Sequence, residues 1–266
     1  KIKKQQETEV SPAISLLVFA MFAYSGMASL SSEILWTRIL VFPMGSTLYS
    51  FALILATFLS GIAFGSLTAN KLLGRSHLVL KFLAIEISIG IFCIAILPVL
   101  ANLTEWTSLA DGYFYSLDSS PEKIIFVRSL FAFALMFPPT FGFGLLFPLA
   151  NHICSYRFES VGKTLGNTYS INTMGAVLGT ILTPFMFIPL WGIRLSLYGI
   201  YALLIFFGVY ILTRLREFKP FSSVIMLSMV FLILVFGLQR SPQFHNCIHC
   251  FQNLFLHYHQ KEFDQP

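Results

Sequence analysis

Seven long apolar runs dominate this chain and restrict the folds open to it. Each holds about 20 mostly apolar residues, the length of α-helix that crosses the roughly 30 Å apolar core of a bilayer. The 266 residues are 56% hydrophobic and only 11% charged, whereas soluble domains carry about 25% charged residues. We therefore expect an all-α polytopic membrane protein with about seven transmembrane helices, at residues 13–35, 47–70, 81–101, 124–150, 168–190, 194–213 and 221–238.

The distribution of basic residues predicts how these helices are oriented. With the N-terminus in the cytoplasm, 11 of the 17 Lys and Arg residues fall on the cytoplasmic side of seven spans, as the positive-inside rule requires. The chain then divides into a cytoplasmic N-terminal segment at 1–12, a transmembrane domain at 13–238 and an extracytoplasmic tail at 239–266. Topology accounts for the net charge of +5, so we expect the lipid bilayer, and no nucleic acid, as a partner.

Small residues at four-residue spacing predict where helices approach closely. Lipid gives no hydrophobic drive for helices to associate, so close packing relies on small residues. The second predicted span contains Gly61 and Gly65, and the fifth contains Gly175 and Gly179. We expect helix packing at these four glycines, with close approach to a ligand as the alternative.

The same two spans follow similar lead-ins, which indicates an internal repeat. These are Gly45-Ser-Thr-Leu-Tyr49-Ser50 and Gly166-Asn-Thr-Tyr169-Ser170. They pair the first three spans with the next three. Because three is odd, the second set would start from the opposite side of the membrane, which predicts a 3+3 inverted repeat plus one helix, as within half of a major-facilitator transporter.

Three ionisable residues are candidates for lying inside the membrane. Each costs about 2.5–3.5 kcal/mol at the bilayer centre on insertion scales, so each needs a reason. Glu86 and Arg128 lie near the starts of their spans, and we expect their side chains to reach the interface. Glu33 lies deeper, before Trp36 and Arg38. Three surroundings stay open for Glu33: a water-filled cavity, an ion pair with Arg128 and the headgroup level.

Two later features complete the candidate intramembrane site. Asn172 and Thr173 precede the glycines of the fifth span and suit interhelical hydrogen bonds or ligand contact. The fourth span has two adjacent prolines followed by two glycines. Because proline removes a backbone donor, we expect a kink or break there, a feature that marks substrate sites in many transporters. The residues of this expected helix break are Pro138, Pro139, Gly142 and Gly144.

The tail gathers candidate metal ligands and thiols, namely His245, Cys247, His249 and Cys250. Two Cys and two His suit zinc, but their spacing is irregular, so a metal is not favoured. A disulfide between Cys247 and Cys250 or free thiols are the main alternatives outside the cytoplasm. We expect neither a metal nor another cofactor in this chain.

Several motifs, in order, resemble the membrane portion of bacterial spermidine-synthase-like membrane proteins, also described as fused major-facilitator/spermidine synthase proteins. The resemblance covers roughly residues 14–238 and implies a location in the bacterial inner membrane. It rests on Ser25-Gly26, Ser32-Glu33-Ile-Leu-Trp36-Thr-Arg38, Gly45-Ser46-Thr47-Leu-Tyr49, Gly61-x3-Gly65-Ser66, Phe147-Pro148, Val161-Gly162, Tyr169-Ser-Ile-Asn172-Thr173, Gly175-x3-Gly179 and Ile188-Pro189-Leu-Trp-Gly192.

In that family a soluble synthase-like domain usually follows the membrane region. Its glycine-rich nucleotide loop and acidic catalytic residues have no counterpart in this sequence, so no catalytic residue carries over and the sequence leans against an enzyme. We expect a non-catalytic integral membrane subunit that anchors or scaffolds partner proteins in a membrane complex. The alternatives are a transporter or channel-like component for a small cationic solute such as a polyamine, and the membrane subunit of a separately encoded synthase-like enzyme.

Overall fold

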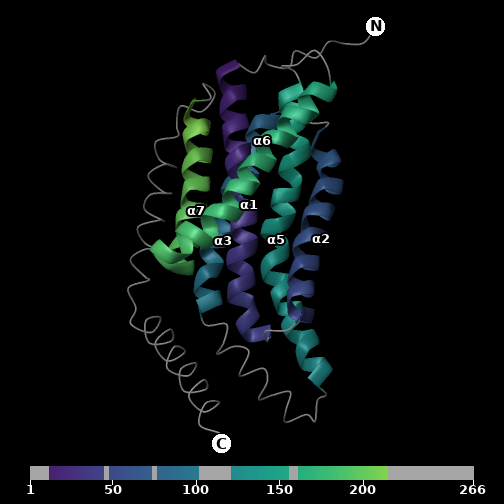
Figure 1. Cartoon of the computed structure of the whole chain (residues 1–266). Helices are drawn as coiled ribbons and strands as arrows, with labels where there is room; N and C mark the ends of the chain where they lie inside the picture. Colours follow the sequence, from purple (N-terminus) through teal and green to yellow (C-terminus); the bar gives the residue numbers. More distant parts are fainter. Residues whose placement is uncertain (1–11, 45–47, 74–76, 102–120, 156–160, 215–266) are drawn as a thin grey trace, which may run out of the picture. The chain divides into compact units, whose positions relative to one another are not determined.

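In a computed structural model, the structure describes residues 12–44, 48–73, 77–101, 121–155 and 161–214, which are almost entirely helical (Figure 1). The predicted seventh span at 221–238 and the tail with its His and Cys residues lie outside the described residues. The helices are α1 (Pro12–Met44), α2 (Leu48–Leu73), α3 (Leu78–Ala101), α5 (Pro121–Ser155), α6 (Val161–Leu182), the π-helical turn η1 (Thr183–Phe187) and α7 (Ile188–Arg214).

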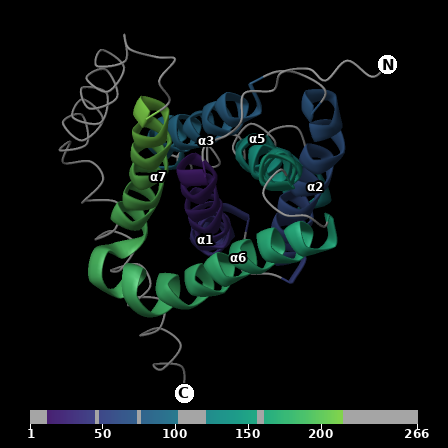
Figure 2. The ribbon, with the colours of Figure 1, turned by 90° about the horizontal axis from the view of Figure 1, so that it is seen from above.

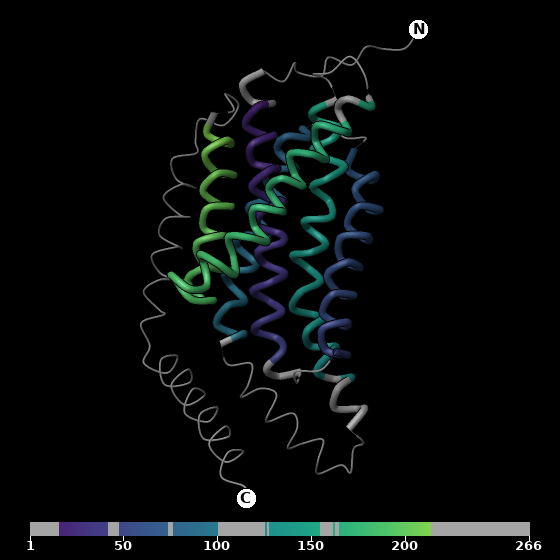
Figure 3. The backbone as a smooth tube through the Cα atoms, viewed as in Figure 1, coloured from purple at the N-terminus to yellow at the C-terminus, as the bar shows by residue number. Residues whose placement is uncertain are grey.

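Five helical stretches among the described residues are long and apolar enough to cross a membrane. They are Leu16–Val41, Leu48–Leu73, Leu78–Leu100, Arg128–Cys154 and Leu165–Thr213. The fifth has 49 residues, and a straight helix of that length would extend roughly 74 Å, more than twice the apolar core of a bilayer. It comprises α6, η1 and α7, and the tube in Figure 3 shows the chain turning back between α6 and α7. The chain is thus an integral membrane protein whose described residues are all-helical.

A kink near the start of α7 depends on one glycine. Gly192 has φ +73° and ψ 172°, a backbone region that is essentially closed to residues with a side chain. A Cβ at Gly192 would meet nothing within 4 Å. The glycine is therefore required by its backbone conformation and not by lack of space. It separates the predicted spans at 168–190 and 194–213.

The prolines of the fourth predicted span do not interrupt it. α5 runs from Pro121 to Ser155 with Pro138, Pro139 and Pro148 inside one helix, so the chain does not break at Pro138 and Pro139, and the expected alternative, a kink, stays a prediction. Prolines are tolerated within membrane helices when neighbouring helices and hydroxyl side chains compensate for the missing backbone bonds. The Thr140 hydroxyl donates to the carbonyls of Met136 and Phe137, at 2.9 and 3.0 Å, directly beside the two prolines.

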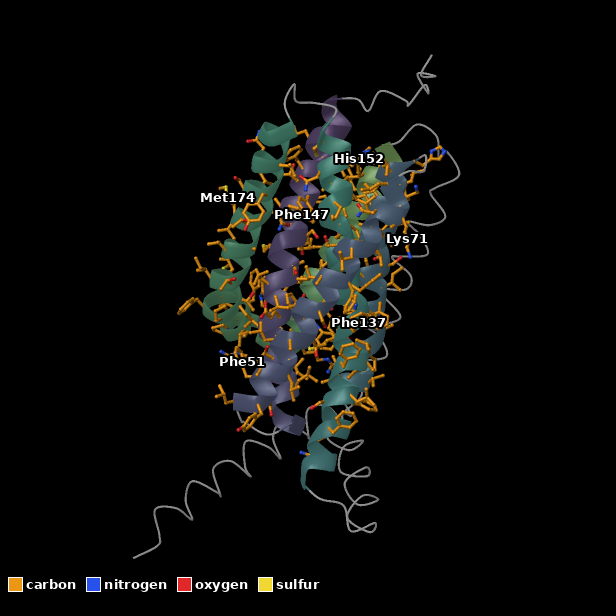
Figure 4. All side chains as sticks on the ribbon, turned by 90° about the vertical axis from the view of Figure 1, so that its right-hand side faces the viewer. Phe51, Lys71, Phe137, Phe147, His152 and Met174 are labelled. Carbon is orange, nitrogen blue, oxygen red and sulfur yellow. The ribbon has the colours of Figure 1, made fainter. Side chains whose placement is uncertain are left out.

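Seen along the bundle, α1 lies between its neighbours, with α6, α7, α3 and α5 around it (Figure 2). The most extensive helix pairs are α2 with α5, α1 with α6, and α3 with α7. Aromatic rings fill the space beside α1: Phe22 packs against Phe82 of α3 and Phe147 of α5, at ring-centre distances of 6.3 and 6.0 Å. Figure 4 shows Phe147 inside the bundle, while Met174 of α6 points away from it.

Glycines bring the paired helices into backbone contact. A Cβ on Gly175 of α6 would meet the Ala23 carbonyl of α1, and one on Gly179 would meet the Met27 carbonyl. In the other pair, a Cβ on Gly61 would meet the Thr140 side chain of α5, and one on Gly65 would meet the Phe141 carbonyl. All four predicted packing glycines therefore lie where two helices approach too closely for a larger residue.

Candidate functional site

A stripe of buried polar side chains follows one side of α1. It consists of Ser25, Ser29, Ser32 and Trp36, all of which are at most 7% exposed. Their spacing of four, three and four residues places them on one face of a helix. In a membrane such groups need partners within the protein, and α3 and α7 supply them.

The lower part of the stripe forms a chain of hydrogen bonds with α7. The Trp36 indole N–H donates to the Tyr201 hydroxyl oxygen at 3.0 Å, and the Tyr201 hydroxyl donates to Ser32 Oγ at 2.9 Å. The Ser32 hydroxyl in turn donates to the Ala28 carbonyl of its own helix. Tyr201 is fully buried and also lies beside the Cys93 thiol of α3. These hydrogen bonds connect α1 to α7 and fix their relative register.

The upper part of the stripe faces a carboxyl group. Glu86 of α3 is 0% exposed, and the Ser25 hydroxyl lies beside its carboxyl group. Neither carboxyl oxygen has a partner in hydrogen-bonding geometry. The expectation that Glu86 extends to the membrane interface is therefore wrong. The reason is its position: Glu86 is on the side of α3 that packs into the bundle, so its side chain has no route to the headgroups.

Glu86 also lies close to the middle of its span. The span runs from Leu78 to Leu100, which puts Glu86 about 4.5 Å from the central residue at 1.5 Å per residue. The Tyr24 phenol of α1 lies within electrostatic range of the carboxyl group. It is held by donating a hydrogen bond to the Ile200 carbonyl of α7 at 2.7 Å. Three helices thus meet around one buried carboxyl group.

The predicted acidic and basic candidates lie elsewhere. Glu33 of α1 and Arg128 of α5 are both half-buried; Glu33 lies in the second half of α1 and Arg128 near the start of α5. Their ion pair stays a prediction. Glu33 lies between Ser32 and Trp36 along α1 but, unlike these two side chains, is only half-buried.

The two polar candidates of α6 are separated by the structure. Asn172 faces α1, where a Cβ on Gly26 would meet its backbone carbonyl and lie 2.7 Å from its side-chain oxygen. Thr173, the next residue, is exposed. Asn172 therefore occupies a helix contact, and Thr173 lies on the outer face of α6.

Sequence reasoning missed Tyr201 and set Glu86 aside, although a signal for both is present. The four-three-four spacing of Ser25, Ser29, Ser32 and Trp36 marks a continuous polar face on an otherwise apolar span, and a polar face within a membrane helix implies polar partners on its neighbours. The candidate metal ligands of the tail lie outside the described residues. Within the described helices, no three His, Cys, Asp or Glu side chains are grouped to hold a metal ion.

The fold and this site define a class: a polytopic helical membrane protein with a buried carboxyl group where α1, α3 and α7 meet. Comparison with known proteins finds no matching family model, no similar curated protein and no similar solved structure. The resemblance to spermidine-synthase-like membrane proteins therefore stays a prediction.

Proposed function

We propose that the chain is a membrane transport protein for a small cationic solute, built from two inverted three-helix repeats, α1–α3 and α5–α7. The observation that carries this proposal is a set of helix contacts that occur twice with their roles exchanged. Inverted repeats of this kind underlie many secondary transporters, in which one repeat moves against the other around a central site.

The first reciprocal contact lies between α3 and α7. A Cβ on Gly90 would be 2.5 Å from Ile205 Cγ1, and a Cβ on Gly208 would be 2.7 Å from Ile87 Cγ1. Ile87 and Gly90 stand three residues apart on α3, as Ile205 and Gly208 do on α7. Each helix therefore presents the same pair of residues to the other, as expected for helices related by a local two-fold axis.

The second set of contacts lies at the two longest interfaces. Gly175 approaches the Ala23 carbonyl, and Gly65 approaches the Phe141 carbonyl. In the same way, Gly26 approaches the Asn172 backbone, and Gly144 approaches the Ile62 backbone. The interface of α6 on α1 thus has the same design as that of α2 on α5.

A constant difference in residue number relates each helix of the first repeat to its counterpart in the second, that is, α1 to α5, α2 to α6 and α3 to α7. A shift of 118 residues converts Ala23, Gly26, Ile87 and Gly90 into Phe141, Gly144, Ile205 and Gly208, and a shift of 110 converts Ile62 and Gly65 into Asn172 and Gly175. In the proposed repeat Gly65, and not Gly61, corresponds to Gly175, which is one helical turn from the register of the small-residue motifs. The lead-ins pair Tyr49 with Tyr169, a shift of 120 residues, so they do not share the register of these contacts. A seventh helix after the two repeats stays a prediction.

Within this proposal Glu33 is the carboxylate that meets the solute. It is the half-buried acid of α1, so its charge is accessible in a way that the charge of Glu86 is not. A carboxylate inside a membrane protein is a partner for a cation, and a polyamine is a small cation of fitting chemistry.

Uptake into proteoliposomes tests the proposal. Vesicles that contain the purified chain should accumulate labelled spermidine or putrescine when the interior is negative, and unlabelled polyamine should compete. Glu33→Gln should reduce uptake at least tenfold. Uptake no faster than in protein-free vesicles would contradict the transport function, and wild-type uptake by Glu33→Gln would remove Glu33 from it.

One observation favours the second function, a non-catalytic subunit that anchors partner proteins. α2 is the least covered of the five spanning stretches among the described residues, and its outer face carries large apolar side chains such as Leu59, Phe64 and Leu67. A membrane helix of a partner subunit would cover that face. Copurification of other subunits from native membranes at a fixed stoichiometry, lost on substitution of Phe64 and Leu67 by Ala, would support this function over transport.

A further inference from the structure

We propose that Glu86 is a proton-binding site inside the membrane, where its carboxyl group takes up one proton and releases it as the two repeats move. This inference rests on the proposed transport function, which it deepens by naming the coupling ion.

Glu86 lies in an apolar interior. An ionised carboxylate persists there only if a cation accompanies it, because an isolated buried charge loses many kcal/mol of the solvation that water provides. Glu86 is fully buried and its two oxygens have no hydrogen-bonding partner. The adjacent groups, the Ser25 hydroxyl and the Tyr24 phenol, are both uncharged polar groups. They can orient a carboxyl group but cannot neutralise a carboxylate.

Among the side chains that the structure describes, the cations of the neighbouring helices lie at other levels of the bundle. The helices packed against α3 are α1, α5 and α7. On α5, Gly142 touches Ile85 and Ile89 of α3 and so marks the level of Glu86. Along α5, His152 and Arg128 are about 15 and 21 Å from Gly142 at 1.5 Å per residue.

Other charged groups of the described helices include Lys81 of α3, which is about 7.5 Å along the helix from Glu86 and donates a hydrogen bond from its ammonium group to the Leu72 carbonyl at 3.1 Å. Another is Arg38 of α1, about 20 Å along the helix from Ser25. On α7, Arg194 lies about 16 Å along the helix from Ile205, which packs against Gly90 one turn after Glu86. On α1, Glu33 is about 12 Å along the helix from Ser25. Tyr201 of α7 and Cys93 of α3 belong to the next polar layer, which is linked to Ser32 and Trp36.

The close packing around the Glu86 carboxyl group favours a proton over a larger cation. Both carboxyl oxygens are shielded from solvent, and apolar side chains such as Phe82 and Leu83 on the preceding turn are also fully buried. A proton needs no additional volume, whereas an ammonium group or a hydrated metal ion would. The chemistry is a simple equilibrium in which the carboxylate and one proton from water form the neutral acid, and no other reactant is needed.

Glu86 lies next to the contact at which the two repeats would move against each other. Glu86 precedes Ile87 and Gly90, the residues that α3 contributes to the reciprocal contact with α7. The 118-residue shift relates Glu86 to Leu204, which is apolar and fully buried. The carboxyl group is thus present in one repeat alone. A sliding of α3 against α7 would change the surroundings of Glu86 while leaving those of the other repeat apolar.

Infrared difference spectroscopy of the purified full chain tests the site without any transport. At neutral pH the wild-type protein should show the C=O band of a buried carboxylic acid, and Glu86→Gln should lack it. Ser25→Ala should shift the band, because it removes the neighbouring hydroxyl. The matched control Ser88→Ala, an exposed position on the same helix, should leave the band unchanged. A band that persists in Glu86→Gln, or that is missing from the wild type, would overturn the proposal.

Proteoliposomes test the coupling. Wild-type polyamine uptake should respond to an imposed pH gradient, and Glu86→Gln should lose this response while Ser88→Ala keeps it. An unchanged response in folded, monodisperse Glu86→Gln would overturn the proton site even if transport itself is established. If neither the wild-type protein nor the variants transport polyamine, the proposed transport function is wrong, and the infrared experiment still decides whether Glu86 binds a proton.

Discussion

The Trp36 indole N–H of α1 donates a hydrogen bond to the Tyr201 hydroxyl oxygen of α7 at 3.0 Å, and the two residues are 165 positions apart in the sequence. The Tyr201 hydroxyl in turn donates a hydrogen bond to Ser32 Oγ at 2.9 Å. All three side chains are buried. Because no water reaches them, their hydrogen bonds are satisfied within the protein or not at all.

Removal of the Tyr201 hydroxyl should therefore destabilise the fold. Tyr201→Phe keeps the ring but leaves the Trp36 N–H without its acceptor, and a buried unsatisfied donor costs about 1–3 kcal/mol. Chemical denaturation in detergent micelles measures this loss. Tyr169→Phe is the matched control, because Tyr169 is 61% exposed, and it should change the free energy of unfolding by less than about 0.5 kcal/mol. Equal effects of the two variants would refute the buried hydrogen-bond chain.

The reciprocal glycines should be equally intolerant of a methyl group. Gly175→Ala forces a Cβ against the Ala23 carbonyl, and Gly65→Ala forces one against the Phe141 carbonyl, so each should destabilise the protein by about 1–3 kcal/mol through overpacking. Gly166→Ala on α6 is the control, because a Cβ there meets nothing within 4 Å. If Gly65→Ala were harmless while Gly175→Ala was costly, the two interfaces would not share one design.

The kink at Gly192 near the start of α7 offers a test of backbone strain alone. Gly192→Ala should cost about 1–3 kcal/mol because φ +73° disfavours any side chain. Gly199→Ala, in the same helix and also with nothing within 4 Å of its Cβ, should be neutral or stabilising by up to about 1 kcal/mol, since alanine favours the helical backbone. Thermal unfolding of the two variants in one detergent compares them directly. A tolerant Gly192 would mean that the kink lies at another residue.

The predicted ion pair of Glu33 and Arg128 can be tested by exchanging charges. Glu33→Arg and Arg128→Glu should each lower the free energy of unfolding, because each places two like charges near one another. The double variant should regain most of the loss if the two side chains pair, as in a double-mutant cycle. Additive losses would show that they act separately.

In the described part of the chain, the sequence was sufficient to locate the long apolar helices approximately, but it did not show which faces of those helices pack inward. Apolar length alone locates α2, predicted at 47–70 and found at Leu48–Leu73. The predicted boundary between the spans at 168–190 and 194–213 includes Gly192, where the helix is interrupted, whereas the Pro138-Pro139 pair lies within a continuous helix.

The candidate site was predicted less well, for a related physical reason. Glu33 and Glu86 are each one acidic residue in an apolar span, and the sequence does not say which side of the span packs inward. Packing against α1 and α7 makes Glu86 the buried one. The similar lead-ins to the second and fifth spans indicate a repeat, yet only the backbone contacts of Gly65 and Gly175 set its register.

The most direct test of the account is a reversible lock between the two repeats during transport. In a chain whose native cysteines are replaced, Ile87→Cys with Gly208→Cys should form a disulfide between α3 and α7, as should the reciprocal pair Gly90→Cys with Ile205→Cys. We predict that oxidation of either pair stops potential-driven polyamine uptake into proteoliposomes, that reduction restores it, and that each single cysteine has no such effect. Undiminished uptake by the fully cross-linked protein would contradict the claim that the repeats move against each other to carry a cation.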